Sequence, residues 1–359
     1  MLFTKQRTIN VEEYTHASVT IKRATLISTG TNPDLQFNGW RIAHGVARTT
    51  CARYLTQPEY WYEYISSLLS LSNLIHSHQP NVRINSNRIS SLRDFSRTNR
   101  IGEISQGLVY LYMQNTGFPY VNDFHFFCEN NQISIPAKTS TPDFVCQDKN
   151  LSNQICLVES KGKEKTSKGD IKSKLAKAIS QCVSGENIIN TSNIGYNVVK
   201  SLGFCSEWSD ENNATDSILH FVDPENETYQ KDINSAPMRF HYASWFYMIG
   251  DFENAQRLIQ GEKINFNEGY FRKTTIDDKQ YWILWRLPKH FGRYEDFDLS
   301  FEIIEELFFS MPFIRTIGVS DEIIKSLTSG EYNEITHVDF KNESTEEYEF
   351  FIDGTIILK

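Results

Sequence analysis

The stretch QICLVESKG, at 154–162, begins as an apolar strand and ends in charged residues. Side chains alternate between the two faces of a strand. One face of this strand therefore carries, in order, Ile155, Leu157, Glu159 and Lys161. Because the first half of the stretch is apolar on both faces, we predict a central strand that is covered on both sides. We expect its charged end to emerge at the rim of a cleft, with Glu159 beside Lys161.

A second strand-like run, TPDFVCQD at 141–148, comes just before this stretch. The intervening KNLSN, at 149–153, suits a hairpin turn, and such a hairpin would bring Asp143 next to Glu159. Two carboxylates and one ammonium suit metal-assisted hydrolysis of a phosphodiester, because Mg²⁺ prefers hard oxygen ligands and makes a bound water more acidic. Lys161 could orient that water, help to deprotonate it or stabilise charge on the phosphorus, and the sequence leaves these roles open.

The surrounding segments predict the order α-β-β-β-α-β between 102 and 223. Apolar residues recur at helical spacing over 102–118 and over 170–185, and Gly185 stands where a C-terminal helix cap belongs. An aromatic-rich run at 118–129 is typical of a strand. Two more strand-like runs, SLGFCSEW and SILHFVDPE, follow the second helix.

The P-D at 142–143, followed by E-S-K at 159–161, resembles the P-D…(D/E)-x-K signature of the restriction-endonuclease-like nuclease superfamily. The α-β-β-β-α-β order resembles the core of that superfamily, and the likeness covers about a third of the chain. It implies an α/β fold in which helices flank a mixed sheet. It also implies catalysis by Asp143, Glu159 and Lys161, with Mg²⁺ (or Mn²⁺) held by the two carboxylates.

The resemblance implies two further site residues. Many members carry a glutamate on the helix before the first core strand, which reaches the metal directly or through water, and Glu103 matches it. Many also place a glutamine or lysine on the helix after E-x-K. One edge of that predicted helix carries Lys174, Lys177 and Gln181, and Gln181 could orient a water or a phosphate. The plainer alternatives are a helix-N-terminal acid for Glu103 and a surface glutamine for Gln181.

Charge is unevenly distributed along a chain whose formal net charge is −9, a value that argues against a protein that coats nucleic acid. Two basic runs nevertheless flank the predicted site, with five arginines within 83–100 and seven lysines within 161–177. One such run is usually solvated surface, but two beside one site favour contact with phosphates. The residues expected to make this contact are Arg93, Arg97, Arg100, Lys163, Lys174 and Lys177. The segment 321–359 has ten acids against three lysines, and we expect it to lie away from nucleic acid.

Three parts are expected along the chain. They are a mainly helical N-terminal extension over 1–100, the nuclease-like core over 101–230 and an α+β domain over 231–359. A length of 359 residues favours two domains or one elaborated domain, and a hydrophobic content of 40% supports a sizeable core. The last part contains two predicted hairpins, at 269–287 and at 348–359, the second with an Asp-Gly turn.

Several classes of protein are disfavoured by the motifs that the sequence lacks. None of the six cysteines forms a C-x-x-C pair, so we interpret them as reduced thiols and expect neither a zinc nor a thiol-redox site. No P-loop, dinucleotide-binding or serine-elbow motif is present. The amino terminus is a poor signal peptide and no stretch has the length of a membrane span, so we expect a cytoplasmic protein without membrane contact.

The expected function is Mg²⁺-dependent phosphodiester hydrolysis, first of all of DNA by an endonuclease. The superfamily includes restriction, repair, recombination and phage-defence nucleases. Because no housekeeping accessory motif is visible, we favour a bacterial restriction or anti-phage defence effector. A catalytically silent binding or assembly subunit and an RNA-directed nuclease stay open as alternatives. The sequence has no recognisable helix-turn-helix or zinc finger, so specificity would come from the flanking domains, from a homo-oligomer or from a partner protein.

Overall fold

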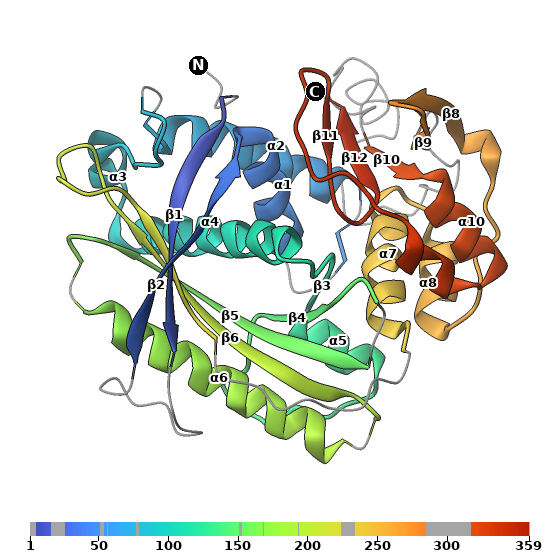
Figure 1. Cartoon of the computed structure of the whole chain (residues 1–359), viewed down its shortest axis with the longest axis horizontal. Helices are drawn as coiled ribbons and strands as arrows, with labels where there is room; N and C mark the ends of the chain where they lie inside the picture. The colour runs from blue at the N-terminus through green and yellow to red at the C-terminus, as the bar shows by residue number, and fades with distance from the viewer. Residues whose placement is uncertain are drawn as a thin grey trace. The chain divides into compact units, whose positions relative to one another are not determined.

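The computed structural model describes residues 5–15, 26–50, 54–55, 57–76, 79–150, 153–167, 169–192, 194–223, 234–284 and 317–358. The chain forms two compact units (Figure 1). The first comprises Met1–Arg53, Tyr62–Asp148 and Ser152–Pro237, and the second comprises Tyr54–Trp61, Lys149–Leu151 and Met238–Lys359. The residues of the predicted site belong to the first unit.

The first unit is built on a seven-stranded mixed sheet in the order β2-β1-β7-β6-β5-β4-β3. Its strands are β1 (Arg7–Thr15), β2 (Ile27–Phe37), β3 (Tyr120–Asp123), β4 (Phe144–Gln147), β5 (Gln154–Glu164), β6 (Asn197–Trp208) and β7 (Ile218–Val222). The pairs β5–β6 and β1–β7 run parallel, and the other neighbours run antiparallel.

Helices flank this sheet, which confirms the expected mixed α/β architecture. The helices before residue 200 are α1 (Gly39–Thr49), α2 (Gln57–Leu74), α3 (Ser86–Ser91), α4 (Asp94–Asn115), α5 (Phe124–Asn130) and α6 (Ile171–Thr191). Figure 1 shows α4 and α6 on opposite sides of β5 and β6. Glycine allows close packing on each side. A Cβ at Gly162 of β5 would collide with Ser105 of α4, and one at Gly203 of β6 would press on Ile179 of α6.

β5 is a central, buried strand, as its apolar sequence predicts. Its residues 155–158 pair antiparallel with β4, which confirms the expected hairpin, and 154–164 pair parallel with β6. β4 is shorter than β5, so from Glu159 to Glu164 no strand in the described part of the chain pairs with the β4 side of β5. The charged end of β5 therefore has one open edge. Because Gly162 faces α4, alternation places Glu159 and Lys161 on the α6 face.

Two segments near the site differ from the prediction. The run at 118–129 forms a strand only as far as Asp123, whose carboxylate accepts a hydrogen bond from the Phe126 amide at 2.8 Å. This cap starts the short helix α5 where a longer strand was expected. α4 begins at Asp94, eight residues before its apolar pattern starts, so part of the arginine-rich run is helical.

Gly185 does not end α6, which continues to Thr191. The glycine serves close packing instead. A Cβ at Gly185 would lie 2.6 Å from Pro142 Cδ, nearer than real Cβ contacts allow. The absent side chain therefore lets α6 lie against the P-D of the predicted signature.

The first hundred residues, expected to be mainly helical, also contribute two strands to the sheet. β1 pairs in parallel with β7, and β2 pairs with β1 at the end of the sheet. The alternating burial of β1, in which Ile9 and Val11 face the core, explains why this segment forms a strand.

The second unit has a five-stranded antiparallel sheet in the order β11-β12-β10-β9-β8. Its strands are β8 (Phe271–Ile276), β9 (Lys279–Leu284), β10 (Ile317–Ser320), β11 (Tyr348–Phe350) and β12 (Thr355–Leu358). The helices of this part are α7 (Ala236–Met248), α8 (Phe252–Gln260) and α10 (Asp321–Ser329), with short 3₁₀ turns η2 (Glu268–Tyr270) and η4 (Tyr332–His337). Both predicted hairpins, β8–β9 and β11–β12, are confirmed. Across the described residues, no helix is both long and apolar enough to cross a membrane.

Candidate active site

Asp143 directly precedes β4 and is held by two hydrogen bonds. Its Oδ2 accepts a hydrogen bond from the Ser160 amide of β5 at 2.8 Å. Its backbone carbonyl accepts one from the Phe124 amide of α5 at 3.0 Å. The side chain of Gln106, on α4, lies near the Asp143 carboxylate and favours its charged form. The carboxylate is therefore fixed against the charged end of β5.

The two residues before Asp143 are anchored by helices. Gln181 of α6 donates from Nε2 to the Thr141 carbonyl at 2.9 Å, and Nε2 of His125 on α5 lies 2.9 Å from Thr141 Oγ1. One turn beyond Gln181, α6 contacts Pro142 through Gly185. Gln181 thus contacts the loop that carries Asp143, and its amide nitrogen is engaged in positioning that loop.

Glu159 carries the second carboxylate of the site and is only 1% exposed. Its Oε1 pairs with Lys161 Nζ, two residues further along the same face of β5. Its Oε2 is buried and finds no hydrogen-bond partner among the described residues. Burial raises the pKa of Glu159 to about 8; the negative charge of Asp143 adds to the rise and Lys161 opposes it. Glu159 Oε2 is therefore a buried acceptor without a hydrogen bond of ordinary geometry, while the Asp143 backbone amide, like Lys161, opposes the rise in the pKa of Glu159.

Two neighbouring carboxyl groups also hold their protons more tightly than usual. Burial raises the pKa of Asp143, against the opposing effects of the Ser160 amide and Lys161. Burial likewise raises the pKa of Asp123, at the end of β3, to about 6, and the charge of Asp143 adds to this. Sequence reasoning missed Asp123, whose carboxylate caps α5.

The side chains near β5 offer two carboxylates to a metal ion. In the described part of the chain, no group of three or more His, Cys, Asp or Glu side chains could hold a metal ion. Asp143 and Glu159 form a two-carboxylate set. Such a set is sufficient for Mg²⁺, which usually binds one or two protein carboxylates and keeps several waters. The residues present therefore fit the expected metal.

Protein-family models, curated proteins and solved structures offer no match to this chain. The contacts of its own residues therefore carry the interpretation. Those contacts bring Asp143, Glu159 and Lys161 together and place Gln181 at the adjoining Thr141.

Glu103, expected as a further metal ligand, has other partners. Its carboxylate pairs with Arg100 on the same helix at 2.9 Å. Its charge also adds to burial in raising the pKa of Glu63 on α2. The α4 residue that contacts Asp143 is Gln106, three positions further along. Residues three apart share a helix face, and this spacing from Glu103 was the only sequence signal for Gln106.

Half of the expected phosphate-binding residues are ion-paired within the chain. The pairs are Arg97–Glu164, Arg100–Glu103 and Lys163–Glu207. The distance is 3.1 Å in the last pair, whose lysine side chain is only 6% exposed. For Arg93, Lys174 and Lys177, by contrast, no acidic partner is found among the residues that the structure describes. These three keep their charge available to a phosphate.

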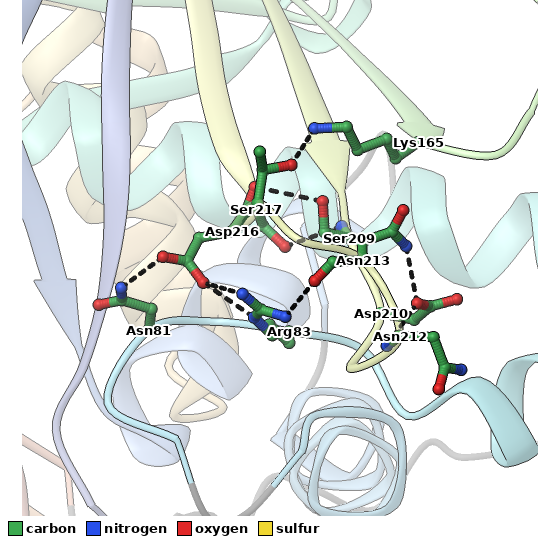
Figure 2. A network of polar contacts seen from close by, with 10 residues as sticks. Asn81, Arg83, Lys165, Ser209, Asp210, Asn212, Asn213, Asp216 and Ser217 are labelled. Carbon is green, nitrogen blue, oxygen red and sulfur yellow. Dashed lines mark hydrogen bonds and ion pairs between the residues drawn. The ribbon is translucent and has the colours of Figure 1, made fainter.

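Arg83, the first residue of the arginine run, hydrogen-bonds to the turn between β6 and β7 (Figure 2). Its Nε donates to Asp216 Oδ1 at 2.8 Å and its Nη1 donates to the Asn213 carbonyl at 2.6 Å. Asn81 donates to the other oxygen of Asp216 at 2.6 Å, and Lys165 reaches the same turn. Both basic runs therefore supply residues that hold the fold together.

Proposed function

We propose that this chain is a Mg²⁺-dependent nuclease that acts on DNA and has a restriction-endonuclease-like core. The observation that carries the proposal is the meeting of Asp143, Glu159 and Lys161 at the open edge of β5. The element order gives further support, since α4, β3, β4, β5, α6 and β6 follow one another in the expected sequence, with α5 inserted between β3 and β4.

Asp143 and Glu159 would hold the Mg²⁺ or Mn²⁺ ion. A buried carboxylate oxygen without a hydrogen bond is costly, and a bound cation would satisfy Glu159 Oε2. When bound, the ion supplies Lewis-acid chemistry, because it polarises a phosphoryl oxygen and makes a water more acidic. A protonated Glu159 is a poor ligand, so its raised pKa makes metal binding compete with a proton.

Lys161 supplies positive charge beside the two carboxylates. Its Nζ pairs with Glu159, and its side chain is part-exposed, so a phosphate can approach it. From this place it can stabilise charge that develops on the phosphoryl oxygens or orient the attacking water. Asp143 is held by the Ser160 amide and keeps its place through the reaction.

The biological setting follows from the likeness of the core alone. We propose a bacterial restriction or anti-phage defence effector of the cytoplasm, in which a second copy of the chain or a partner protein contributes to target choice. The RNA-directed and catalytically silent alternatives are outcomes of the test below.

The test is cleavage by the purified full chain. Supercoiled plasmid, linear duplex DNA, single-stranded DNA and RNA are each incubated with Mg²⁺, with Mn²⁺ and with EDTA. We expect metal-dependent cleavage of DNA. Glu159→Gln and Lys161→Ala should each slow it by about 100-fold or more, because each removes a group that acts on the reacting phosphate.

Lys172→Ala is the matched control, since 170–172 is another (D/E)-x-K triplet and lies at the start of α6. This variant should cut at the wild-type rate. A Lys161→Ala protein that is as active as wild type would overturn the catalytic assignment. A folded wild-type protein that binds DNA but never cuts either polymer would instead favour the silent binding subunit.

A further inference from the structure

A stripe of residues along α4 leads from the start of the helix to the candidate site. Residues eleven positions apart on a helix lie about three turns apart on the same face. The members of this stripe, which we call the Phe95 stripe, are Phe95, Asn99, Gly102 and Gln106. Its last member lies near the Asp143 carboxylate and favours its charged form.

The Phe95 stripe is open to solvent until it reaches the site. Phe95 is 78% exposed and Asn99 is exposed as well. At Gly102 an added Cβ would meet no atom within 4 Å. One exposed aromatic ring is ordinary on a protein surface. What needs an explanation is its position at the start of an exposed stripe that ends beside Asp143.

Two arginines without an acidic partner in the described residues lie close to Phe95 in the sequence. Arg88, at the middle of α3, and Arg93, just before α4, are both exposed. An exposed aromatic ring on a basic stretch of the chain is a combination with which proteins bind single-stranded nucleic acid, because the ring stacks on a base while the cations contact the backbone.

The other side of the open β5 edge is also basic. Lys174 and Lys177 lie on the edge of α6 that carries Gln181, and Gln181 contacts Thr141, two residues before Asp143. The two lysines precede Gln181 by one and two turns, so they extend from the site along α6. α4 and α6 cover opposite faces of the sheet, and the unpaired edge from Glu159 to Glu164 lies between those faces.

From this arrangement we infer that a single-stranded polynucleotide lies along the Phe95 stripe with one unpaired base stacked on Phe95. The inference rests on the proposed function and adds its substrate class, since the bases of an intact duplex are already stacked on each other. Phe95 and Gln106 are eleven residues apart, which is about 16 Å along the helix. At 3.4 Å per stacked nucleotide, the stacked base lies about five nucleotides from the bond that is cut.

The experiment measures binding in EDTA, so that cleavage does not enter. Fluorescence anisotropy follows a labelled single strand of mixed sequence with the full chain, Phe95→Ala, Phe95→Trp and the neighbouring exposed control Ser96→Ala. We expect Phe95→Ala to weaken binding about tenfold, which corresponds to the loss of one base–aromatic stack. Phe95→Trp should bind at least as well as wild type, and Ser96→Ala should not differ from it.

A second series locates the stacked base. One abasic site is moved along the strand, and the wild-type chain should lose affinity mainly at one position, whereas Phe95→Ala should show no loss specific to that position. Equal binding by Phe95→Ala and wild type, with metal-dependent cleavage intact, would overturn the inference and leave the nuclease proposal standing. If the wild-type protein bound a single strand through Phe95 and cut nothing, the inference would stand and the nuclease proposal would be overturned. A change in self-association in Phe95→Ala, without a change in strand binding, would assign the ring to a contact between copies and also overturn the inference.

Discussion

Glu159 is a buried carboxyl group that keeps its proton far above its ordinary range, because burial and the charge of Asp143 raise its pKa to about 8. In the unfolded chain the same group loses its proton near pH 4.5, the ordinary pKa of a glutamate side chain. The folded state therefore binds more protons between these two values, and its stability is expected to fall as the pH rises through them. The whole loss in the metal-free protein is on the order of 5 kcal/mol, and about half of it falls between pH 6 and pH 8.5.

This expectation is checked by thermal unfolding in EDTA at pH 6 and at pH 8.5. The wild-type chain should unfold at a lower temperature at pH 8.5, and Glu159→Gln should be much less sensitive to pH. Mg²⁺ should stabilise the wild type more at pH 8.5 than at pH 6, because a deprotonated Glu159 binds it better. Glu103→Gln serves as the control and should keep the wild-type pH dependence. A Glu159→Gln protein with the full wild-type pH dependence would assign that dependence to other groups.

At the scale of single residues, the sequence predicted the contacts that are local in the chain. Alternation along one strand predicted that Glu159 lies beside Lys161, and one hairpin predicted that Asp143 joins them. Gln106 escaped prediction because its contact depends on how α4 crosses the sheet, which no local pattern encodes.

At the scale of secondary-structure elements, the contact between α6 and the loop that carries Pro142 and Asp143 positions Asp143. Gly185→Val would add a branched side chain where even a Cβ lies 2.6 Å from Pro142 Cδ. Either α6 or the loop has to shift, and overpacking of this kind costs about 1–3 kcal/mol. We expect lower stability together with a lower cleavage rate, since Asp143 follows Pro142 directly.

Asn187→Val is the matched control, because it places the same branched residue at an exposed position of α6 and so costs only helix propensity. Unfolding in urea and the cleavage rate are measured for both variants. If Gly185→Val lost stability and retained full activity, the α6 contact would support the fold without positioning Asp143.

The elements that the sequence predicted well are those with a strong period or a clear turn. The β4–β5 hairpin and the two hairpins of the second unit are examples. α5 was missed because its aromatic residues suit a strand equally well, and the Asp123 cap decided the outcome. Gly185 was misread because a glycine that permits close packing looks like a helix cap in a sequence.

At the scale of the whole molecule, the sequence could not predict which charged residues form ion pairs with one another. A run of basic residues shows how many cations are near one another in the chain and says nothing of distant acids. Arg97 meets Glu164, and Arg83 meets Asp216, 133 residues away. The acidic segment 321–359 forms part of the second unit, and its distance from nucleic acid stays a prediction. The two basic runs together hold twelve cations, and fewer than twelve are therefore available to contact nucleic acid.

Lys174 and Lys177 are expected to be among the few residues that draw nucleic acid to a molecule with a net charge of −9. Each phosphate contact releases counterions, so the logarithm of the binding constant falls with the logarithm of the salt concentration, with a slope of about −0.9 per contact on duplex DNA and −0.7 on a single strand. Lys174→Glu with Lys177→Glu should weaken binding at low salt and make the slope shallower by up to two contacts. The control is Lys5→Glu with Lys263→Glu, which changes the net charge equally at two exposed positions elsewhere. Binding titrations in EDTA at several salt concentrations distinguish direct phosphate contacts by the two lysines from a general effect of net charge. If both double variants changed the slope alike, attraction would follow the net charge of the molecule, and the two lysines would lose their assignment as phosphate contacts.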